Sequence, residues 1–250
     1  MKFSLKSAGL FAGIVASSLL LAGCQSPPTQ AVSSGPISAS TAAAVQTKAS
    51  QAAMTPEQAL AGLREGNARF VAGTPLTRNF PADVKATASG QYPFAVILSC
   101  LDSRQPVEIV FDQGVGDVFC ARVAGNVLND DILGSMEFAC KASGAKLIAV
   151  VGHSNCGAVK GAVDDVDLGN LTGLLAKIKP GMDAVPAGVQ PRTSKNSAFV
   201  DQVSEANVRL VMKEIRERSP ILSQMLDQGQ IALVGGMYDL ATGKVQFYDK

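Results

Sequence analysis

Residues 146–156 read Lys-Leu-Ile-Ala-Val-Val-Gly-His-Ser-Asn-Cys, and the expected fold is organised around this stretch. The apolar run 146–151 is typical of a strand that is covered on both faces of a parallel sheet. His153, the only histidine in 250 residues, and Cys156 follow this run, and residues 157–163 after them favour a helix. In open parallel sheets, sites form at the carboxyl ends of the strands, which is where these two side chains stand.

A second apolar run, residues 94–99, ends in the same way, in Cys100-Leu101-Asp102-Ser103-Arg104. Ends of neighbouring parallel strands lie about 5 Å apart, or about 10 Å apart with one strand between them. Both distances allow side chains to reach a shared ion. The two strand ends together offer two sulfurs, one imidazole, a carboxylate and a guanidinium.

The remaining pattern alternates strands with helices, which implies an α/β fold with a mostly parallel sheet, right-handed crossovers and helices on both faces. We expect four buried strands and one edge strand after a lone N-terminal helix that Thr55 caps. The strands are expected at residues 94–99, 117–121, 146–151, 231–234 and 243–247. The helices are expected at residues 55–73, 106–111, 130–143, 157–163, 170–178, 197–218 and 220–228, with a loop or frayed helix at 74–91 and a loop at 181–196.

Composition narrows the classes of partner. The chain has a formal net charge of +1, so it offers no basic surface for a nucleic acid and no marked attraction for an acidic polymer. Tryptophan is absent and aromatic residues make up 5% of the chain, which disfavours carbohydrate or base stacking. The hydrophobic fraction of 47% is enough for a sizeable core.

The N-terminus has the pattern of a secretory signal. Lys2 and Lys6 precede an apolar run, residues 8–20, that is short for a membrane-spanning helix. The run ends in Leu-Ala-Gly-Cys24, which resembles a bacterial lipobox, so we expect lipidation of Cys24 and a membrane tether without a span. Residues 24–53 are small and polar and predict a flexible tether. The expected organisation is therefore a signal peptide (1–23), a tether (24–53) and one domain (54–250).

This N-terminus also predicts where the protein resides. Gln25 and Ser26 include no acidic retention signal, which favours the outer membrane of a Gram-negative envelope, facing the periplasm. Export raises the question of disulfides, because that compartment is oxidising. Cys120 and Cys140 lie in apolar runs, where free cysteines behave as small core hydrophobes, so we expect no disulfide between them.

Cys100, His153 and Cys156 are the donor types that bind zinc. A structural zinc site has a fourth protein ligand, and a catalytic site keeps an open position for water. Asp102 lies beside this group, and Arg104 can hold its carboxylate ionised through two parallel hydrogen bonds. Held in this way, Asp102 can accept a proton from a water on the metal. Unpaired, it could be the fourth ligand of an inactive form.

The motifs Cys-Leu-Asp-Ser-Arg (100–104) and His-Ser-Asn-Cys-Gly (153–157) resemble those of the β-class carbonic anhydrases. Further similar pieces are Phe119, Arg-Val-Ala-Gly-Asn (122–126), Glu-Ile-Arg-Glu-Arg-Ser-Pro (214–220) and the final strand pair. The resemblance covers nearly the whole of residues 54–250. It implies a zinc enzyme that converts CO2 reversibly to bicarbonate and a proton through a zinc-bound hydroxide, with Cys100, His153 and Cys156 as ligands and Asp102–Arg104 as a catalytic dyad.

The resemblance also implies substrate-binding residues. Gln91 matches a glutamine that hydrogen-bonds substrate, Phe119 matches an apolar pocket position, and Gly157 matches a glycine whose backbone N–H lies near substrate. Phe138 replaces the tyrosine of plant-type members. One subgroup has a regulatory bicarbonate pocket with a tryptophan where this chain has Ile97, so that pocket is not implied, although Arg122 matches the subgroup's arginine.

The family builds its sites at a dimer interface, so the resemblance implies a homodimer or tetramer in which the helix at 55–73 embraces a second subunit. Since His153 would be a metal ligand, proton export should depend on external buffer or on a carboxylate such as Asp102. Two alternatives stay open: a carbon disulfide or carbonyl sulfide hydrolase on the same fold, and a non-catalytic zinc-binding lipoprotein.

Overall fold

A computed structural model of the protein describes residues 43–248. The signal peptide (1–23), the lipidation site Cys24 and the first part of the expected tether lie outside the described residues. The chain divides after Ser38, and the unit from Ala39 onward contains all of the elements below. Within residues 43–248, no helix combines the length and apolar character needed to cross a bilayer.

Five strands form one sheet in the order β2-β1-β3-β4-β5. They are β1 (Ala95–Ser99), β2 (Val118–Arg122), β3 (Leu147–His153), β4 (Ala232–Tyr238) and β5 (Val245–Phe247). The first four are parallel, and β5 pairs antiparallel with β4. The mostly parallel α/β fold is therefore confirmed, and β1 and β3 are direct neighbours, with Ser99 opposite Val151.

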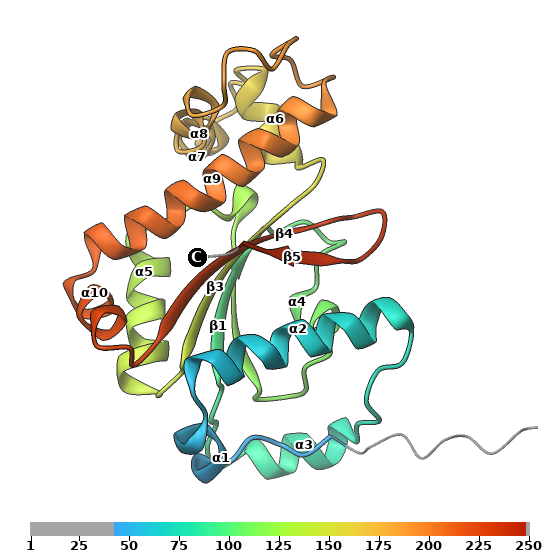
Figure 1. The fold of residues 1–250 in the computed structure, drawn as a ribbon, viewed down its shortest axis with the longest axis vertical. Helices are drawn as coiled ribbons and strands as arrows, with labels where there is room; N and C mark the ends of the chain where they lie inside the picture. The colour runs from blue at the N-terminus through green and yellow to red at the C-terminus, as the bar shows by residue number, and fades with distance from the viewer. Residues whose placement is uncertain (1–42, 249–250) are drawn as a thin grey trace, which may run out of the picture. The chain divides into compact units, whose positions relative to one another are not determined.

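Helices and helical turns connect the strands, as Figure 1 shows. They are α1 (Lys48–Ala53), α2 (Pro56–Ala72), α3 (Phe80–Thr87), α4 (Val107–Val110), the 3-10 turn η1 (Ala124–Asn126), α5 (Asp130–Glu137), the π-helical turn η2 (Phe138–Ala142), α6 (Gly157–Val163), α7 (Asn170–Ala176), α8 (Lys179–Asp183), α9 (Ser197–Arg218) and α10 (Pro220–Asp227). The segment 74–91, expected as a loop or frayed helix, contains α3, which Asn79 caps. The helix expected at 130–143 changes to π-helical geometry at Phe138.

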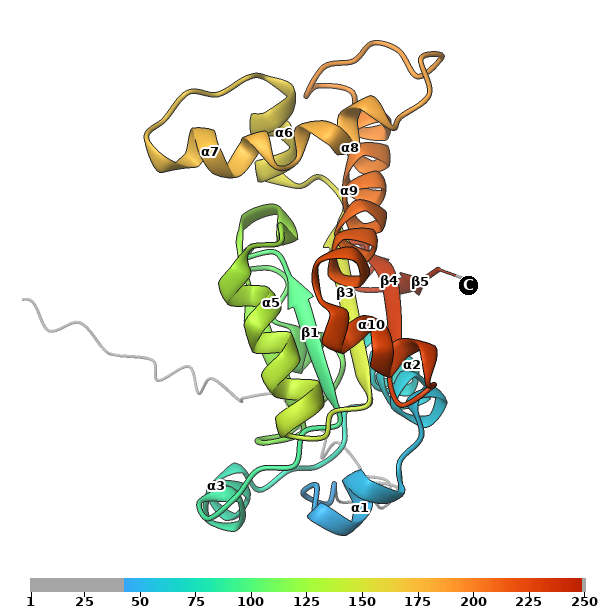
Figure 2. The same ribbon diagram turned by 90° about the vertical axis from the view of Figure 1, so that its left-hand side faces the viewer.

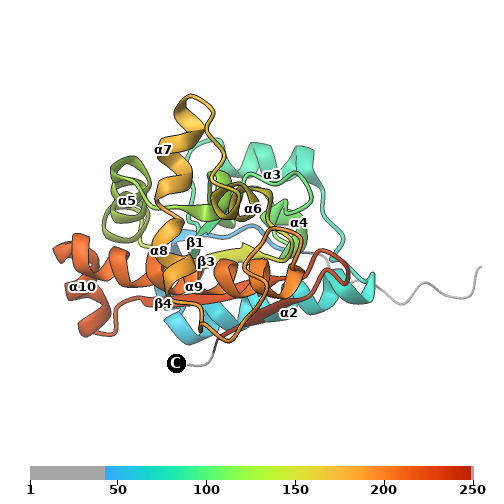
Figure 3. The same cartoon turned by 90° about the horizontal axis from the view of Figure 1, so that it is seen from above.

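Two apolar layers sandwich the sheet. On one face, alternate residues of β1 and β3 pack against α5, α9 and α10; on the other, the intervening residues pack against α2 and α4. Seen from above, α5 and α10 lie on one side of the strands, and α2 and α4 lie on the other (Figure 3). Because both faces are covered, β1 and β3 are buried along their whole length, as the continuous apolar runs predict.

Helices α6, α7 and α8 gather beyond the carboxyl ends of β1 and β3 (Figure 2). A third apolar cluster fills this region and contains Cys100 and Cys156 together with residues of α6, α7 and the start of α9. This cluster leaves the strand ends enclosed rather than open to solvent.

Strand β2 is not buried as expected. It lies at the edge of the sheet, and its residues are only partly covered, with Cys120 exposed. Cys120 is therefore not a core cysteine, whereas Cys140 is buried, and burial raises the pKa of the Cys140 thiol to about 12. Both thiols are free in this structure.

The folded region begins before residue 54. Thr47 caps α1, and the buried side chain of Gln51 donates hydrogen bonds to Pro93 O (2.7 Å) and Ser143 O (2.8 Å), which tie α1 to the loops before β1 and β3. The tether expected up to residue 53 is therefore too long, because an isolated glutamine in a polar stretch gives no sign of a long-range bond in the sequence.

Helix α2 begins as expected, with Thr55 and Gln58 forming a reciprocal cap and Pro56 in the first turn. Its apolar face does not project as an arm. Ala59 and Leu63 are fully buried against their own sheet, and Asn67 bonds to the loop before β5. The helix is part of the core of its own chain, so this face is not available to embrace a second subunit.

Candidate metal centre

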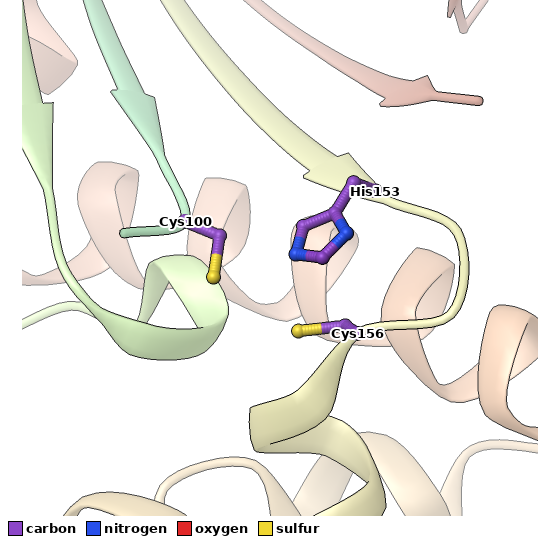
Figure 4. Close-up of side chains that lie close together, drawn as sticks. All are labelled: Cys100, His153 and Cys156. Carbon is purple, nitrogen blue, oxygen red and sulfur yellow. The ribbon is translucent and has the colours of Figure 1, made fainter. Parts of the chain in front are cut away.

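Three donor side chains meet at the carboxyl end of the sheet. Cys100 follows β1, His153 is the last residue of β3, and Cys156 immediately precedes α6. Figure 4 shows the three side chains pointing toward one another. Their ligand atoms all lie within 4.8 Å of one another, and all three residues are buried. The pairing of β1 with β3 brings these residues together across more than fifty positions of sequence.

The hydrogen bonds of His153 leave one ring nitrogen free for a ligand. Nδ1 lies 2.9 Å from the carbonyl oxygen of Ser154, and because a carbonyl only accepts, Nδ1 carries the proton. Nε2 is then a bare acceptor, buried and without a hydrogen-bond partner among the described residues. An orphaned, buried imidazole nitrogen that faces two sulfurs is the arrangement that a bound metal ion satisfies.

The two sulfurs are buried in the third apolar cluster, and few polar groups contact them. The Gly125 N–H donates to Cys100 Sγ at 3.3 Å. A hydrogen bond with the Cys156 side chain lowers the pKa of Cys100, while the same contact and burial raise the pKa of Cys156. The donor set of two sulfurs and one imidazole fits zinc and leaves a fourth tetrahedral position for a further ligand.

Asp102 and Arg104 form the expected pair beside these donors. Arg104 donates from Nε to Oδ1 (2.9 Å) and from Nη2 to Oδ2 (2.7 Å), and its backbone N–H also donates to Oδ1 (2.9 Å). These bonds hold the pKa of Asp102 well below its usual range. Oδ2 of Asp102 lies 3.9 Å from His153 Nε2, which places an ionised carboxylate next to the metal position.

Two further residues brace the site, and the sequence did not assign them this role. Arg122 donates from Nε to Cys100 O (3.1 Å) and from Nη2 to Asp102 O (2.6 Å), so it fixes the loop after β1. Gln105 is fully buried and donates to Val151 O (3.3 Å), which connects this loop to β3. Arg122 belongs to the 122–126 motif that resembles the family, and this motif could have indicated its role. Gln105 follows an arginine in a polar stretch that is typical of a surface loop, so the sequence gave no sign of its role.

The other predicted substrate residues lie elsewhere in the chain. Gln91 is exposed at the amino end of β1, and Phe119 pairs with Val96, three positions before the end of that strand. The ring of Phe119 packs edge-on to Phe138, with centroids 6.2 Å apart. Gly157 begins α6, next to Cys156, and a Cβ there would meet nothing within 4 Å. Within a single chain, Gly157 is the only one of these three predicted residues that lies next to a metal ligand.

Comparisons with known proteins agree with this geometry. The family model described as carbonic anhydrase matches residues 95–245. The carbonic anhydrase 2 of Mycobacterium tuberculosis (strain H37Rv) is 37% identical over 195 residues, covering 78% of this chain and 93% of that protein. The carbonic anhydrase of Mycolicibacterium smegmatis is 37% identical over 193 residues, covering 76% and 92%. A crystal structure of a β-carbonic anhydrase of Aspergillus fumigatus is 26% identical with a TM-score of 0.58, covering 77% of this chain and 90% of that one.

Proposed function

The chain belongs to the β-class carbonic anhydrase family, and we propose that the group described above is where it hydrates CO2 reversibly to bicarbonate and a proton. One observation carries this proposal: three zinc-type donors lie within 4.8 Å of one another, beside an ion-paired carboxylate. A non-catalytic zinc protein has no use for that carboxylate. The relatives that match about three quarters of the chain at 37% identity are carbonic anhydrases, so a carbon disulfide or carbonyl sulfide hydrolase is not favoured.

Cys100, His153 and Cys156 would hold the zinc of this family. Zinc, when bound, acts as a Lewis acid and lowers the pKa of a water so that hydroxide is available near neutral pH. The chain contributes the surroundings. All three ligands are less than 5% exposed, so the site has a low effective dielectric and its electrostatic interactions are strong.

Asp102 orients the reacting water. Arg104 keeps its carboxylate ionised and directs Oδ2 toward the metal position, where it can accept a hydrogen bond. Because the pKa of Asp102 is held so low, it is a weak base and does not retain a proton near neutral pH. External buffer, rather than Asp102, is therefore the carrier of the product proton.

We propose that Gln91 and Phe119, which lie away from the metal ligands of their own chain, serve the metal centre of a second copy of the chain. Strand β2 is a sheet edge with unpaired backbone groups, and Phe119 and Phe138 line a hollow of about 700 Å³ beside it. Phe138 is 56% exposed and adds an apolar ring to this edge of the sheet. If two copies meet across a two-fold axis, their β2 strands run antiparallel. The amino end of one sheet, with Gln91, then lies beside the carboxyl end of the other, with its metal ligands.

Mixing two inactive variants tests this arrangement. Cys100→Ser removes a ligand but keeps Gln91, and Gln91→Ala does the reverse. If Gln91 acts across the interface, randomly exchanged 1:1 mixtures form about one half mixed dimers, each with one intact site, and regain roughly a quarter of wild-type activity. If no activity returns although mass analysis detects mixed dimers, Gln91 does not act across the interface.

The activity itself is tested on a soluble form that begins after Cys24. Stopped-flow CO2 hydration, combined with elemental analysis, should give an active protein with one zinc per chain. Cys156→Ser is the matched variant and should lose both zinc and activity. An active wild type without stoichiometric metal would refute the assignment of the three donors, and hydrolysis of carbon disulfide without CO2 hydration would favour the alternative substrate.

We also propose that the protein is exported and anchored by lipid on Cys24 at the outer membrane, facing the periplasm. The support is the sequence alone: a positive start, an apolar run and Leu-Ala-Gly-Cys24. Labelling with a fatty-acid analogue should modify the full chain and not Cys24→Ser, and density-gradient fractionation should find the label with the outer membrane. Equal labelling of both forms would exclude Cys24 as the site.

A further inference from the structure

Asn207, in the middle of α9, reaches the turn that contacts Cys100. It is 1% exposed, and its Nδ2 donates to the Gly125 carbonyl oxygen at 2.8 Å. The N–H of the same glycine donates to Cys100 Sγ at 3.3 Å. Two hydrogen bonds through one residue therefore connect a long helix, remote in sequence, to a metal-ligand sulfur.

The turn itself needs such a support. Gly125 has φ +63° and the following Asn126 has φ +43°, both in the left-handed region. A Cβ at Gly125 would lie 2.6 Å from Ile178 Cδ1, so both this contact and the positive φ favour glycine there. A glycine-containing turn of three residues has a flexible backbone, and the direction of its N–H depends on what fixes the peptide from outside.

The chemistry of the contact specifies an amide at position 207. The Gly125 oxygen can only accept, so the nitrogen of the Asn207 side chain must face it. The Oδ1 of Asn207 is buried without a hydrogen-bond partner among the described residues. A buried, unpaired amide oxygen is destabilising. Asn207 is therefore a poor choice for stability alone, which is typical of residues kept for a site.

Helix α9 is held in place at this point. A Cβ at Gly181 of α8 would lie 3.2 Å from the backbone nitrogen of Asn207, so the two helices are in close contact there. Asn207 thus projects from a fixed backbone. The hydrogen bond from its amide can therefore hold the Gly125 peptide in one orientation.

We propose that Asn207 is a positioning residue of the metal centre, which holds the Gly125 peptide so that its N–H donates to the Cys100 thiolate. The proposal rests on zinc binding at Cys100. An N–H···S hydrogen bond fixes the direction of the sulfur lone pairs and withdraws electron density from the thiolate. The sulfur then donates less charge to the metal, which stays a stronger Lewis acid. Outer partners of this kind typically change metal affinity or activity by 10- to 100-fold.

Three variants separate positioning from packing. Asn207→Leu has a similar size and no donor. Asn207→Asp has the same shape and, when ionised, cannot donate to a carbonyl. Ser204→Ala is the control, because Ser204 lies one turn earlier on α9, is 3% exposed and bonds only to the Val200 carbonyl of its own helix (2.9 Å).

The experiment uses cadmium and cobalt in place of zinc. In the ¹¹³Cd protein, the Gly125 amide proton should show scalar coupling to the metal through the N–H···S bond. In the Co²⁺ protein, Asn207→Leu and Asn207→Asp should shift the sulfur-to-cobalt absorption band to longer wavelength. Chelator competition should show zinc affinity lower by roughly 10- to 100-fold. Ser204→Ala should leave all three readouts at wild-type values.

The outcomes distinguish this inference from the zinc assignment. A wild type that binds cadmium without coupling at Gly125 overturns the inference alone, even if no Asn207 variant folds. Asn207 variants that keep the band, the coupling and the zinc affinity, with only a lower melting temperature, show that Asn207 acts only in packing. A wild type that binds none of these metals overturns both proposals.

Discussion

Replacing Asn67 by alanine tests whether α2 belongs to the core of its own chain. Asn67 is 4% exposed and makes three hydrogen bonds that join separate parts of the fold. Its Nδ2 donates to Val110 O (3.1 Å) and Gly243 O (2.9 Å), and its Oδ1 accepts from the Val245 N–H (2.8 Å). The residue thus connects α2 to the end of α4 and to the start of β5.

The expected loss follows from what remains unpaired. Each hydrogen bond contributes about 1 kcal/mol net, and a buried group left without a partner costs about 1–3 kcal/mol. Water can reach the Gly243 carbonyl, which is only partly buried, so two buried groups dominate. We expect Asn67→Ala to lower the free energy of unfolding by about 2–4 kcal/mol. For a domain of this size, the melting temperature should fall by roughly 5–15 °C.

Thermal and urea unfolding of the soluble form measure this change. Asn67→Asp should lose at least as much stability as alanine, because it keeps the acceptor for Val245 but turns an oxygen of a buried carboxylate toward two carbonyl oxygens. Glu65→Ala, an exposed position on the same helix, is the control and should change stability by less than about 0.5 kcal/mol. Zinc content should be unchanged in all variants, since Asn67 does not contact the metal ligands.

Two results would refute the reasoning. A wild-type melting temperature for Asn67→Ala would show that its bonds do not stabilise the fold. A loss that appears only on dilution, where dimers dissociate, would show that α2 is the embracing arm that the family resemblance implied and does not pack on its own chain.

Three other predictions concern the site and its surroundings. Asp102→Asn and Arg104→Ala should keep one zinc per chain while CO2 hydration falls roughly 10- to 100-fold or more; wild-type rates would remove the pair from the mechanism. Turnover should rise strongly with buffer concentration, because His153 is the only histidine and would be occupied by the metal; a flat response would require another proton path. Burial alone would raise the pKa of Asp112, but hydrogen bonds from Arg69, the Leu76 N–H and Arg78 outweigh it and lower the pKa. The ionised carboxylate therefore stabilises the fold above its unfolded pKa of about 4, and the difference in stability between wild type and Asp112→Asn should shrink as pH falls below that value; an unchanged difference at pH 3 would contradict this.

The sequence alone was sufficient to predict the sheet interior and the meeting of the three donor side chains. Continuous apolar runs before Cys100 and His153 identify strands covered on both faces, and parallel strands necessarily end at the same edge. The ligand set follows because sulfur and imidazole at two adjacent strand ends have a common chemical use. The caps of α2 were equally local, since Thr55 and Gln58 interact within one turn.

Only the tertiary structure decided which groups surround those ligands. The side chains of four polar residues are buried through hydrogen bonds to distant backbone, although no sequence pattern marks these positions as buried: Gln51, Asn67, Gln105 and Asn207. Such bonds depend on where a remote carbonyl points after folding, and no periodicity encodes that direction. Strand β2 was expected to be buried for a related reason. An apolar run does not show whether the strand has neighbouring strands on both sides or lies at the edge of the sheet.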